Sequence, residues 1–431
     1  MASLTLIRLG QIDAKASHVC WRQKHWLLGR LGRVRFFLAC AKTRCYCSSG
    51  KFLAIDHFAS RPVPRPKLAP VVAILPETTP FVGPEAIERR DGVPTRARIG
   101  ANENPFGPAP SVLAAMQAAA RDTWHYGDPE NYDLREAIAA HLKIPSANVM
   151  PGEGVDAILG MAVRLYAAPG DVVVTSLGGY PTFNYHIAGY GAVMHTVPYI
   201  GTREDIDGLA AAARETNAAM VYLANPDNPM GSWWDAASVE RFIAAVPEST
   251  MIILDEAYGE FAPEGVLPPI DLSRPNLLRM RTFSKAYGLA GARVGYVFGE
   301  AGSISAFNRI RNHFGISNIA QTGATAALAD HAHLQNSIEA VREALKDTAT
   351  IARNHGLNPL PTATNFLAID CGRDGAYAQA ILQGLAAHGV FVRKPAVAGL
   401  NQHIRVSAGT PADRKLFAEA LGQVLETLQR G

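Results

Sequence analysis

Two short apolar runs constrain the fold of this chain more than any other feature of its sequence. Residues 220–224 (MVYLA) and 251–254 (MIIL) are continuously apolar, which is typical of strands buried on both faces of a parallel sheet. Each run is followed by a polar residue, Asn225 after the first and Asp255 after the second. In open parallel sheets, ligands bind beyond the carboxyl ends of the strands. The sequence therefore predicts an α/β protein with its site at that edge.

The wider pattern predicts two α/β domains preceded by an arm. Strand and helix patterns alternate over residues 108–300, which predicts a large domain with a mostly parallel sheet and helices on both faces. Residues 301–431 combine long helical stretches with short strands and predict a smaller C-terminal α/β domain. Residues 61–107 would form a linker and an N-terminal arm. Helices are expected near residues 111–120, 133–142, 157–166, 235–245, 316–355, 376–388 and 411–428, and further strands near 172–175, 365–370, 390–393 and 403–406.

A lone lysine, Lys285, lies in the small and apolar segment 284–295. A desolvated lysine amine shifts toward its neutral, nucleophilic form and can make a Schiff base with an aldehyde. Arg293 follows eight residues later, and a guanidinium fork matches the oxygens of a phosphate. A lone lysine is more often a surface residue. With the motifs described next, however, this segment indicates pyridoxal phosphate as the cofactor.

Three side chains at strand ends suit the ring of that cofactor. An ionised Asp255 can keep a pyridine nitrogen protonated, which makes the ring an electron sink. Three residues later, the phenol of Tyr258 can reach the ring oxygen. Asn228, in the proline-rich turn 225–231, can donate a hydrogen bond to the same oxygen. Each feature alone is more often an ordinary turn or strand end, but their order along the chain favours a cofactor site.

Other motifs suit a phosphate, an aromatic stack and an anion. Residues 152–156 (GEGVD) precede a helical run from Ala157, so free N–H groups and the positive helix end are available to a phosphate. Tyr180, beyond a strand, supplies an aromatic face. Arg405 lies within an apolar strand, where an unpaired charge is costly. It should therefore meet an anion, either a protein carboxylate or the carboxylate or phosphate of a substrate.

These motifs together resemble the fold-type-I pyridoxal-phosphate-dependent aminotransferases of class I/II, and are most similar to the histidinol-phosphate aminotransferase family. The resemblance runs from about Phe81 to the C-terminus. It includes residues 101–105 (ANENP), Tyr126, the turn 225–231, residues 255–258 (DEAY), the lysine segment and residues 404–410 (IRVSAGT).

The resemblance implies a role for each matching residue. Three residues would be catalytic. Lys285 would be the Schiff-base lysine, and Asp255 would be the partner of the pyridine nitrogen. Tyr258, together with Asn228, would contact the ring oxygen. Tyr180 would be the stacking ring. The implied phosphate ligands are Gly154, Val155, Asp156, Ser284 and Arg293, joined by Tyr126 from the other subunit of a homodimer, and the implied substrate-facing residues are Asn102, Arg393 and Arg405.

Four departures from the family pattern concern the substrate side. Family members usually carry threonine where Met230 stands and tyrosine where Phe81 stands, and that tyrosine hydroxyl helps to hold a substrate phosphate. Gly100 replaces a frequent asparagine, and residues 311–315 (RNHFG) differ from the usual proline-tyrosine segment. The substrate mouth is therefore expected to differ from the family's, whereas the cofactor motifs are intact.

The activity that the resemblance implies is transamination in amino-acid biosynthesis. An amino group would move between histidinol phosphate, or a similar amine, and 2-oxoglutarate by a ping-pong mechanism. Transamination of aromatic or aliphatic amino acids and decarboxylation of a phosphoamino acid on the same scaffold stay open as alternatives. A cofactor-binding sensor is a further alternative, although the first sixty residues show no clear helix-turn-helix pattern.

Composition excludes several other classes. The chain of 431 residues is 48% hydrophobic, yet no apolar run approaches the roughly 20 residues of a membrane span. A formal net charge of +3, with the cationic excess near the N-terminus, gives no nucleic-acid footprint. We therefore predict small-molecule partners, with neither membrane nor nucleic acid. No metal site is predicted, because Cys45 and Cys47 lack a second ligand pair at zinc spacing.

Residues 1–60 stand apart from the enzyme body. They are rich in Arg and Lys and hold four of the 5 cysteines, so no disulfide framework is expected to support the fold. The charge bias fits a transit peptide of mitochondrial type, and a misassigned start fits equally. We expect this extension to be disordered. The predicted location is cytoplasmic, or mitochondrial or plastid if the extension is a real transit peptide.

Overall fold

The computed structural model describes residues 65–77 and 81–430. The chain from Leu68 onward forms one compact unit. The predictions for residues 1–60 lie outside the described residues. Within the described ranges, no helix combines the length and the apolar character needed to cross a membrane.

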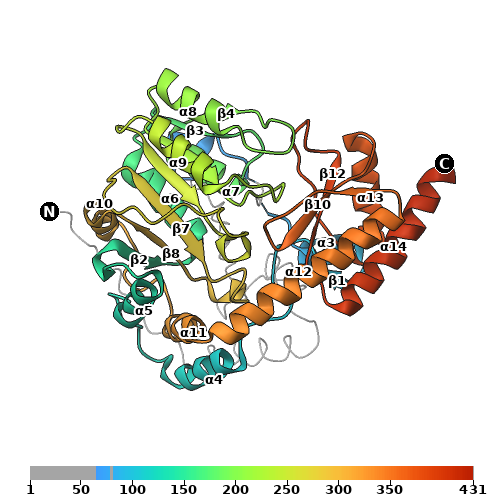
Figure 1. The fold of residues 1–431 in the computed structure, drawn as a ribbon, viewed down its shortest axis with the longest axis horizontal. Coiled ribbons are helices and arrows are strands. Elements are labelled where there is room, and N and C mark those ends of the chain that lie inside the picture. Colours follow the sequence, from blue (N-terminus) through green and yellow to red (C-terminus); the bar gives the residue numbers. More distant parts are fainter. Residues whose placement is uncertain (1–64, 78–80, 431) are drawn as a thin grey trace, which may run out of the picture. The chain divides into compact units, whose positions relative to one another are not determined.

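A seven-stranded sheet forms the centre of this unit (Figure 1). Five adjacent strands of this sheet run parallel to one another, and strand β8 (Gly295–Gly299) is antiparallel to both of its neighbours. The mostly parallel sheet predicted from the sequence is therefore confirmed. In spatial order the strands are β2 (Val149–Gly152), β8 (Gly295–Gly299), β7 (Leu277–Thr282), β6 (Met251–Asp255), β5 (Met220–Ala224), β3 (Val172–Ser176) and β4 (Val193–Val197).

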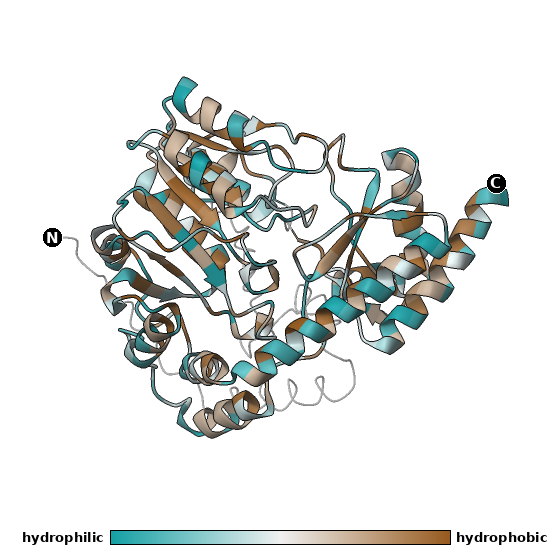
Figure 2. Cartoon of the chain, viewed as in Figure 1, coloured by the Kyte–Doolittle hydropathy of each residue, from teal (hydrophilic) through white to brown (hydrophobic). Residues whose placement is uncertain are grey.

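Helices cover both faces of the sheet because the inner strands are apolar on both sides. Tyr222 and Ile253 pack into one cluster with α6 (Gly154–Tyr166) and α7 (Pro181–Gly189). The alternate residues of the same strands, such as Val221, belong to a second cluster with α8 (Ile206–Glu215) and α9 (Ala236–Ala245). The inner strands are accordingly brown in Figure 2. This two-sided burial explains why their sequences are continuous apolar runs.

The C-terminal part of the chain builds two smaller sheets. A three-stranded antiparallel sheet has the order β12 (His403–Ser407), β10 (Phe366–Asp370) and β9 (Asn358–Pro359). A two-stranded parallel sheet joins β1 (Ala97–Arg98) near the N-terminus to β11 (Val390–Phe391). Three helices pack near these strands, namely α12 (His331–Asn354), α13 (Gly375–Ala387) and α14 (Pro411–Arg430). The division into a large and a small domain at residue 300 stays a prediction.

The expected helices agree closely with those of the structure, with one difference. The helical stretches expected over residues 316–355 are two helices, and the carboxylate of Asp330 accepts a hydrogen bond from the His333 N–H at the start of the second. Helix α6 begins at Gly154 instead of Ala157, since Gly154 adopts a φ of +80° that lets the chain turn early into the helix. The other helices are α2 (Pro70–Ala73), α3 (Pro84–Asp91), α4 (Pro110–Ala119), α5 (Tyr132–Leu142), α10 (Ala301–Ala306) and α11 (Asn318–Ala329).

A buried ion network ties β6 to β7. Glu256, which is 0% exposed, accepts hydrogen bonds from Arg279 Nη2 at 2.5 Å and from Arg281 Nε at 2.9 Å. Arg279 Nη1 also donates to the carbonyl of Pro269. Both guanidinium groups form their ion pairs with this one carboxylate, so its loss would leave buried positive charge without an ion-pair partner.

We therefore expect Glu256→Gln to lower the free energy of unfolding by about 3–5 kcal/mol. Urea denaturation followed by circular dichroism measures this change. The matched control is Glu426→Gln, which removes the exposed partner of Arg430 and should change stability little. Equal losses in the two variants would contradict the importance of the buried network.

Candidate active site

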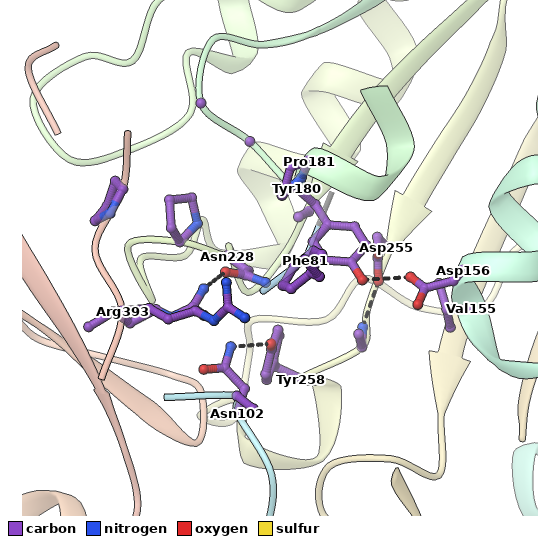
Figure 3. Close-up of a pocket in the computed structure, with 18 of the residues that line it drawn as sticks. Phe81, Asn102, Val155, Asp156, Tyr180, Pro181, Asn228, Asp255, Tyr258 and Arg393 are labelled. Carbon is purple, nitrogen blue, oxygen red and sulfur yellow. Dashed lines mark hydrogen bonds between the residues drawn. The ribbon is translucent and has the colours of Figure 1, made fainter. Parts of the chain in front are cut away.

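A cavity of about 730 Å³ lies beyond the carboxyl ends of the parallel strands (Figure 3). Parallel strands end at the same edge of a sheet, so residues far apart in sequence meet there. The cavity is lined by the following residues that the sequence predicted: Asn102, Val155, Asp156, Tyr180, Asn228, Asp255, Tyr258, Ser284, Lys285, Arg293, Arg393 and Arg405.

Lys285 follows β7 and places its amine in the cavity. Its Nζ donates a hydrogen bond to the main-chain carbonyl of Asn102 at 3.0 Å, and its own carbonyl accepts one from Asn104 Nδ2. Burial, together with the nearby positive charge of Arg405, lowers the pKa of Lys285 to about 8. The neutral, nucleophilic form of the amine is thus about a tenth of the total at pH 7, far more than for an ordinary lysine.

Asp255 ends β6, and two hydrogen bonds hold its carboxylate. Tyr222 OH donates to Oδ2 at 2.8 Å, and the Ala257 N–H donates to Oδ1 at 2.9 Å. Burial raises the pKa of Asp255 to about 6, while these hydrogen bonds favour the ionised form. Sequence reasoning missed Tyr222. A single hydroxyl inside the apolar run of β5, next to the strand that carries Asp255, was the signal for it.

Tyr258 and Asn102 form a second hydrogen-bonded group on the cavity wall. Asn102 Nδ2 donates to Tyr258 OH at 2.9 Å (Figure 3), and Ser407 Oγ donates to Asn102 Oδ1 at 3.1 Å. Burial raises the pKa of Tyr258, so the phenol keeps its proton and can donate it to an oxygen in the cavity. Asn102 was predicted to face the substrate, and its side chain also positions Tyr258.

The N-terminus of α6 and Arg293 form the corner expected to hold a phosphate. The first N–H groups of a helix have no partner within the helix. A Cβ on Gly154 would lie 2.7 Å from Arg293 Nη2, so a larger residue there would displace the guanidinium from this corner. Val155 and Ser284 line the cavity beside it, whereas Gly154 acts by allowing the close approach.

An aromatic ring covers the same corner. Tyr180 OH donates to Asp156 Oδ1 at 2.5 Å (Figure 3), and Arg293 Nη2 lies 3.5 Å from Asp156 Oδ2. These contacts fix the Tyr180 ring in the cavity wall. An amine, a carboxylate, an aromatic face and a phosphate-binding corner thus surround one cavity, and this set of groups fits pyridoxal phosphate.

Arg405 lies on β12 and enters the cavity from the opposite side. Its Nη1 donates to Asn228 Oδ1 at 2.6 Å and its Nη2 to the carbonyl of Gly100 at 3.3 Å, while its buried Nε has no partner among the described residues. Burial lowers the pKa of Arg405 to about 10. No carboxylate in the described ranges forms an ion pair with it. Of the two anions that the sequence left open, a substrate anion is therefore favoured.

Arg393 lies beside it at the edge of the cavity. Its Nη2 donates to the carbonyl of Val82 at 2.8 Å, and its guanidinium carbon lies 4.6 Å from the centre of the Phe81 ring. Of the four departures from the family pattern, Phe81 lines the cavity, and Met230, Gly100 and residues 311–315 do not.

Tyr126 is not part of the cavity of its own chain. It is 77% exposed and packs against the exposed ring of Phe314 at a centroid distance of 4.6 Å. Its predicted role in the site of a second subunit stays a prediction.

Comparison with known families and proteins gives consistent matches. The family model "Aminotransferase class I and II" matches residues 97–421. Histidinol-phosphate aminotransferase 1 of Nitrosococcus oceani is 34% identical over 345 residues, which cover 79% of this chain and 92% of that protein. Histidinol-phosphate aminotransferase 2 of Pseudomonas aeruginosa is 36% identical over 331 residues, covering 76% and 89%.

A solved structure is more similar still. Histidinol-phosphate aminotransferase from Sinorhizobium meliloti, in complex with pyridoxal-5'-phosphate, is 52% identical to this chain. The similarity covers 85% of this chain and 99% of that chain, with a TM-score of 0.83.

The lowered pKa of Lys285 predicts unusual reactivity of its amine in the cofactor-free protein. Labelling of Lys285 by an amine-reactive reagent should reach half of its maximum near pH 8, because the neutral amine is the reactive form. Ordinary exposed lysines titrate near pH 10.4 and serve as the internal control. Mass spectrometry of labelled peptides measures both, and a half-maximum for Lys285 above pH 10 would contradict the prediction.

Proposed function

Because the chain belongs to the class I and II aminotransferases and uses pyridoxal phosphate, we propose that it transfers an amino group between histidinol phosphate, or a similar amine, and 2-oxoglutarate. A ping-pong mechanism is part of this proposal. The observation that carries it is the buried Arg405, which has no carboxylate partner in the described part of the chain and lies beside Arg393 in the cavity. The names of the relatives support the same donor.

When bound, pyridoxal phosphate supplies an aldehyde and an electron-withdrawing ring that stabilises negative charge at the substrate's α-carbon. We assign the ring nitrogen to Asp255 and the ring oxygen to Tyr258 and Asn228. Arg405 holds Asn228 Oδ1, so the amide nitrogen of Asn228 is left to donate into the cavity. Tyr180 would cover the ring, and Ser284, Arg293 and the start of α6 would hold the phosphate.

Lys285 is the residue that we assign to proton transfer at the substrate's α-carbon. A general base works best when its pKa is near the working pH, and burial brings the amine into that range. When the amine is free, the carbonyl of Asn102 accepts its hydrogen bond and keeps it in the cavity. Nζ can thus take a proton from one position and return it to another.

Two arginines are assigned to the substrate anion. Histidinol phosphate has a phosphate and no carboxylate, whereas 2-oxoglutarate has two carboxylates. One site must therefore bind both kinds of anion in turn. A planar guanidinium can donate two hydrogen bonds to either group, and both Arg393 and Arg405 line the cavity.

The exposed pair of Tyr126 and Phe314 supports the proposal of a homodimer. Large exposed aromatic side chains are typical of protein interfaces, and Trp124, two residues before Tyr126, is a third exposed ring. In this arrangement the partner subunit's Tyr126 would reach the phosphate of the cofactor. A cytoplasmic location also stays a proposal.

One observation favours a second candidate function, transamination of an unphosphorylated aromatic or aliphatic amino acid. Phe81 lines the cavity under Arg393 but has no hydroxyl to donate to a phosphate. The alternatives of a phosphoamino-acid decarboxylase and of a non-catalytic sensor have no comparable support in the site.

The choice of donor is tested by steady-state kinetics with 2-oxoglutarate as acceptor. We expect kcat/KM for histidinol phosphate to exceed that for phenylalanine or leucine by at least about tenfold, which corresponds to about 1.4 kcal/mol. Phe81→Tyr should then change kcat/KM for histidinol phosphate little, because the present site already binds the phosphate.

The opposite pattern would identify the second candidate. Poor turnover of histidinol phosphate by the wild-type enzyme, improved selectively by Phe81→Tyr, would show that the natural donor is unphosphorylated. Phenylalanine is the control donor, because the added hydroxyl has no phosphate to contact there.

The assignment of Asp255 is tested by Asp255→Asn. A neutral amide cannot hold the ring nitrogen protonated, so kcat should fall by several orders of magnitude. The control is Tyr222→Phe, which removes one hydrogen bond to the carboxylate but keeps its charge and should cost far less. A loss of only a few-fold in Asp255→Asn would mean that another residue is the partner of the nitrogen.

A further inference from the structure

A second buried carboxyl group lies next to the site and has no role in the proposed reaction. Asp227 is 2% exposed and occupies the turn after β5, directly before Asn228. Tyr199 OH donates to its Oδ1 at 2.9 Å, and the Met230 N–H donates to its Oδ2 at 3.1 Å. None of the cationic side chains in the described ranges forms an ion pair with it. Buried carboxylates without a cationic partner are uncommon, because their desolvation is costly.

The charged and titratable groups around Asp227 come from three other parts of the chain. Glu204, which precedes α8, is also buried; its Oε2 accepts a hydrogen bond from the Ala224 N–H, and its Oε1 has no partner among the described residues. Burial and the nearby Asp227 both raise the pKa of Glu204. Tyr258 lies close enough for its pKa to be raised slightly by Asp227. The group of opposite charge is Arg405 on β12.

Asp227 and Arg405 influence each other through space. The negative charge of Asp227 raises the pKa of Arg405, and the positive charge of Arg405 lowers the pKa of Asp227. They are joined indirectly, because Arg405 Nη1 donates to the side chain of Asn228, the residue that follows Asp227. An anion bound to Arg405 would therefore meet a second negative charge in a poorly solvated region.

We infer that Asp227 controls how strongly Arg405 binds a substrate anion, with the protonated form of Asp227 favouring binding and the ionised form opposing it. This inference rests on the proposed role of Arg405 as the anion-binding residue. It assigns a specificity-determining and pH-sensing role to a residue that need not touch the substrate.

The direction of the effect follows from the burial of Asp227. Desolvation raises its pKa to about 7, and the hydrogen bonds from Tyr199 and the Met230 N–H, with the charge of Arg405, act in the opposite direction. Below pH 7 the carboxyl is neutral and Arg405 keeps its full attraction for an anion. As the pH rises through 7, Asp227 ionises and anion binding weakens. By linkage, binding of an anion must draw a proton onto Asp227.

The same coupling bears on the choice of donor. A phosphate dianion is repelled by an ionised Asp227 about twice as strongly as a monocarboxylate at the same position, because the Coulomb energy scales with charge. Raising the pH should therefore weaken binding of phosphorylated ligands more than binding of monocarboxylates.

The test is calorimetric binding of sulfate to the cofactor-loaded enzyme between pH 6 and pH 9. Sulfate is dianionic over this whole range, so the ligand itself does not titrate. Titration in buffers of different ionisation enthalpy gives the number of protons taken up on binding. The wild-type enzyme should take up a fraction of a proton near pH 7.5 at Asp227, in addition to any proton taken up at the nitrogen of Lys285, whose pKa Arg405 also lowers. Asp227→Asn should remove the share of Asp227 and keep the rest, bind sulfate as the wild type does at pH 6, and bind it roughly fivefold to tenfold more tightly at pH 8.5.

Tyr199→Phe is the matched control and a second test that leaves the carboxyl in place. It removes a hydrogen bond that favours the ionised carboxylate, so proton uptake should persist and its midpoint should move to higher pH. An unmoved midpoint would overturn the inference even if Asp227→Asn folded poorly. Uniformly weaker binding in Asp227→Asn, with the wild-type proton uptake retained, would also overturn it, since that is the result of a purely structural role.

Arg405→Ala separates this inference from the proposed function. Loss of sulfate binding in Arg405→Ala supports Arg405 as the anion site, and the Asp227 variants then decide the inference alone. Sulfate binding equal to that of the wild type in Arg405→Ala would overturn the proposed anion site, and with it the inference.

Discussion

The site depends on the removal of charged groups from water at one edge of a parallel sheet. Lys285, Asp255 and Arg405 are each shifted toward their neutral forms by burial, and each is held by hydrogen bonds that leave one face directed into the cavity. In water the amine of Lys285 would be fully charged and unreactive. The guanidinium of Arg405 would attract an anion only weakly there. Desolvation thus sets both the reactivity of the amine and the strength of anion binding.

A short polar segment near the N-terminus links the parts of this site. Asn102 adopts a φ of 55°, and its carbonyl accepts hydrogen bonds from Lys285 Nζ and from Asn365 Nδ2. Its side chain bridges Tyr258 and Ser407. One residue therefore connects the lysine, the phenol at the ring side and the C-terminal sheet. Strain at this backbone position is offset by five hydrogen bonds to four residues, because the Asn102 N–H also donates to Ser407 Oγ.

The sequence predicted the fold and most cofactor contacts because these depend on local patterns. The runs at β5 and β6 are apolar on both faces, and the residues at their carboxyl ends had to meet at one edge; the structure confirms the sheet, and the comparisons confirm the family and the cofactor. The hydrogen bond from Tyr222 to Asp255 was missed, although the lone hydroxyl in the run of β5 indicated it. The hydrogen bond from Arg405 to Asn228 was not predictable from local patterns, because the two residues are separated by 177 positions and only the folded chain brings them together.

The substrate side was harder to predict because a change of residue type does not reveal where the side chain points. Met230 and Phe81 were both read as changes at the mouth of the site. Met230 is 1% exposed and packs against Ala368 and Leu400, so its longer side chain is accommodated in the apolar core between the turn and β10. Phe81 lines the cavity, with its ring against Arg393. A guanidinium over an aromatic face is held in place without losing its hydrogen-bond donors. The Phe81 ring therefore still contacts Arg393 without a hydroxyl at residue 81, and under the proposed function the guanidinium keeps N–H donors for a substrate anion.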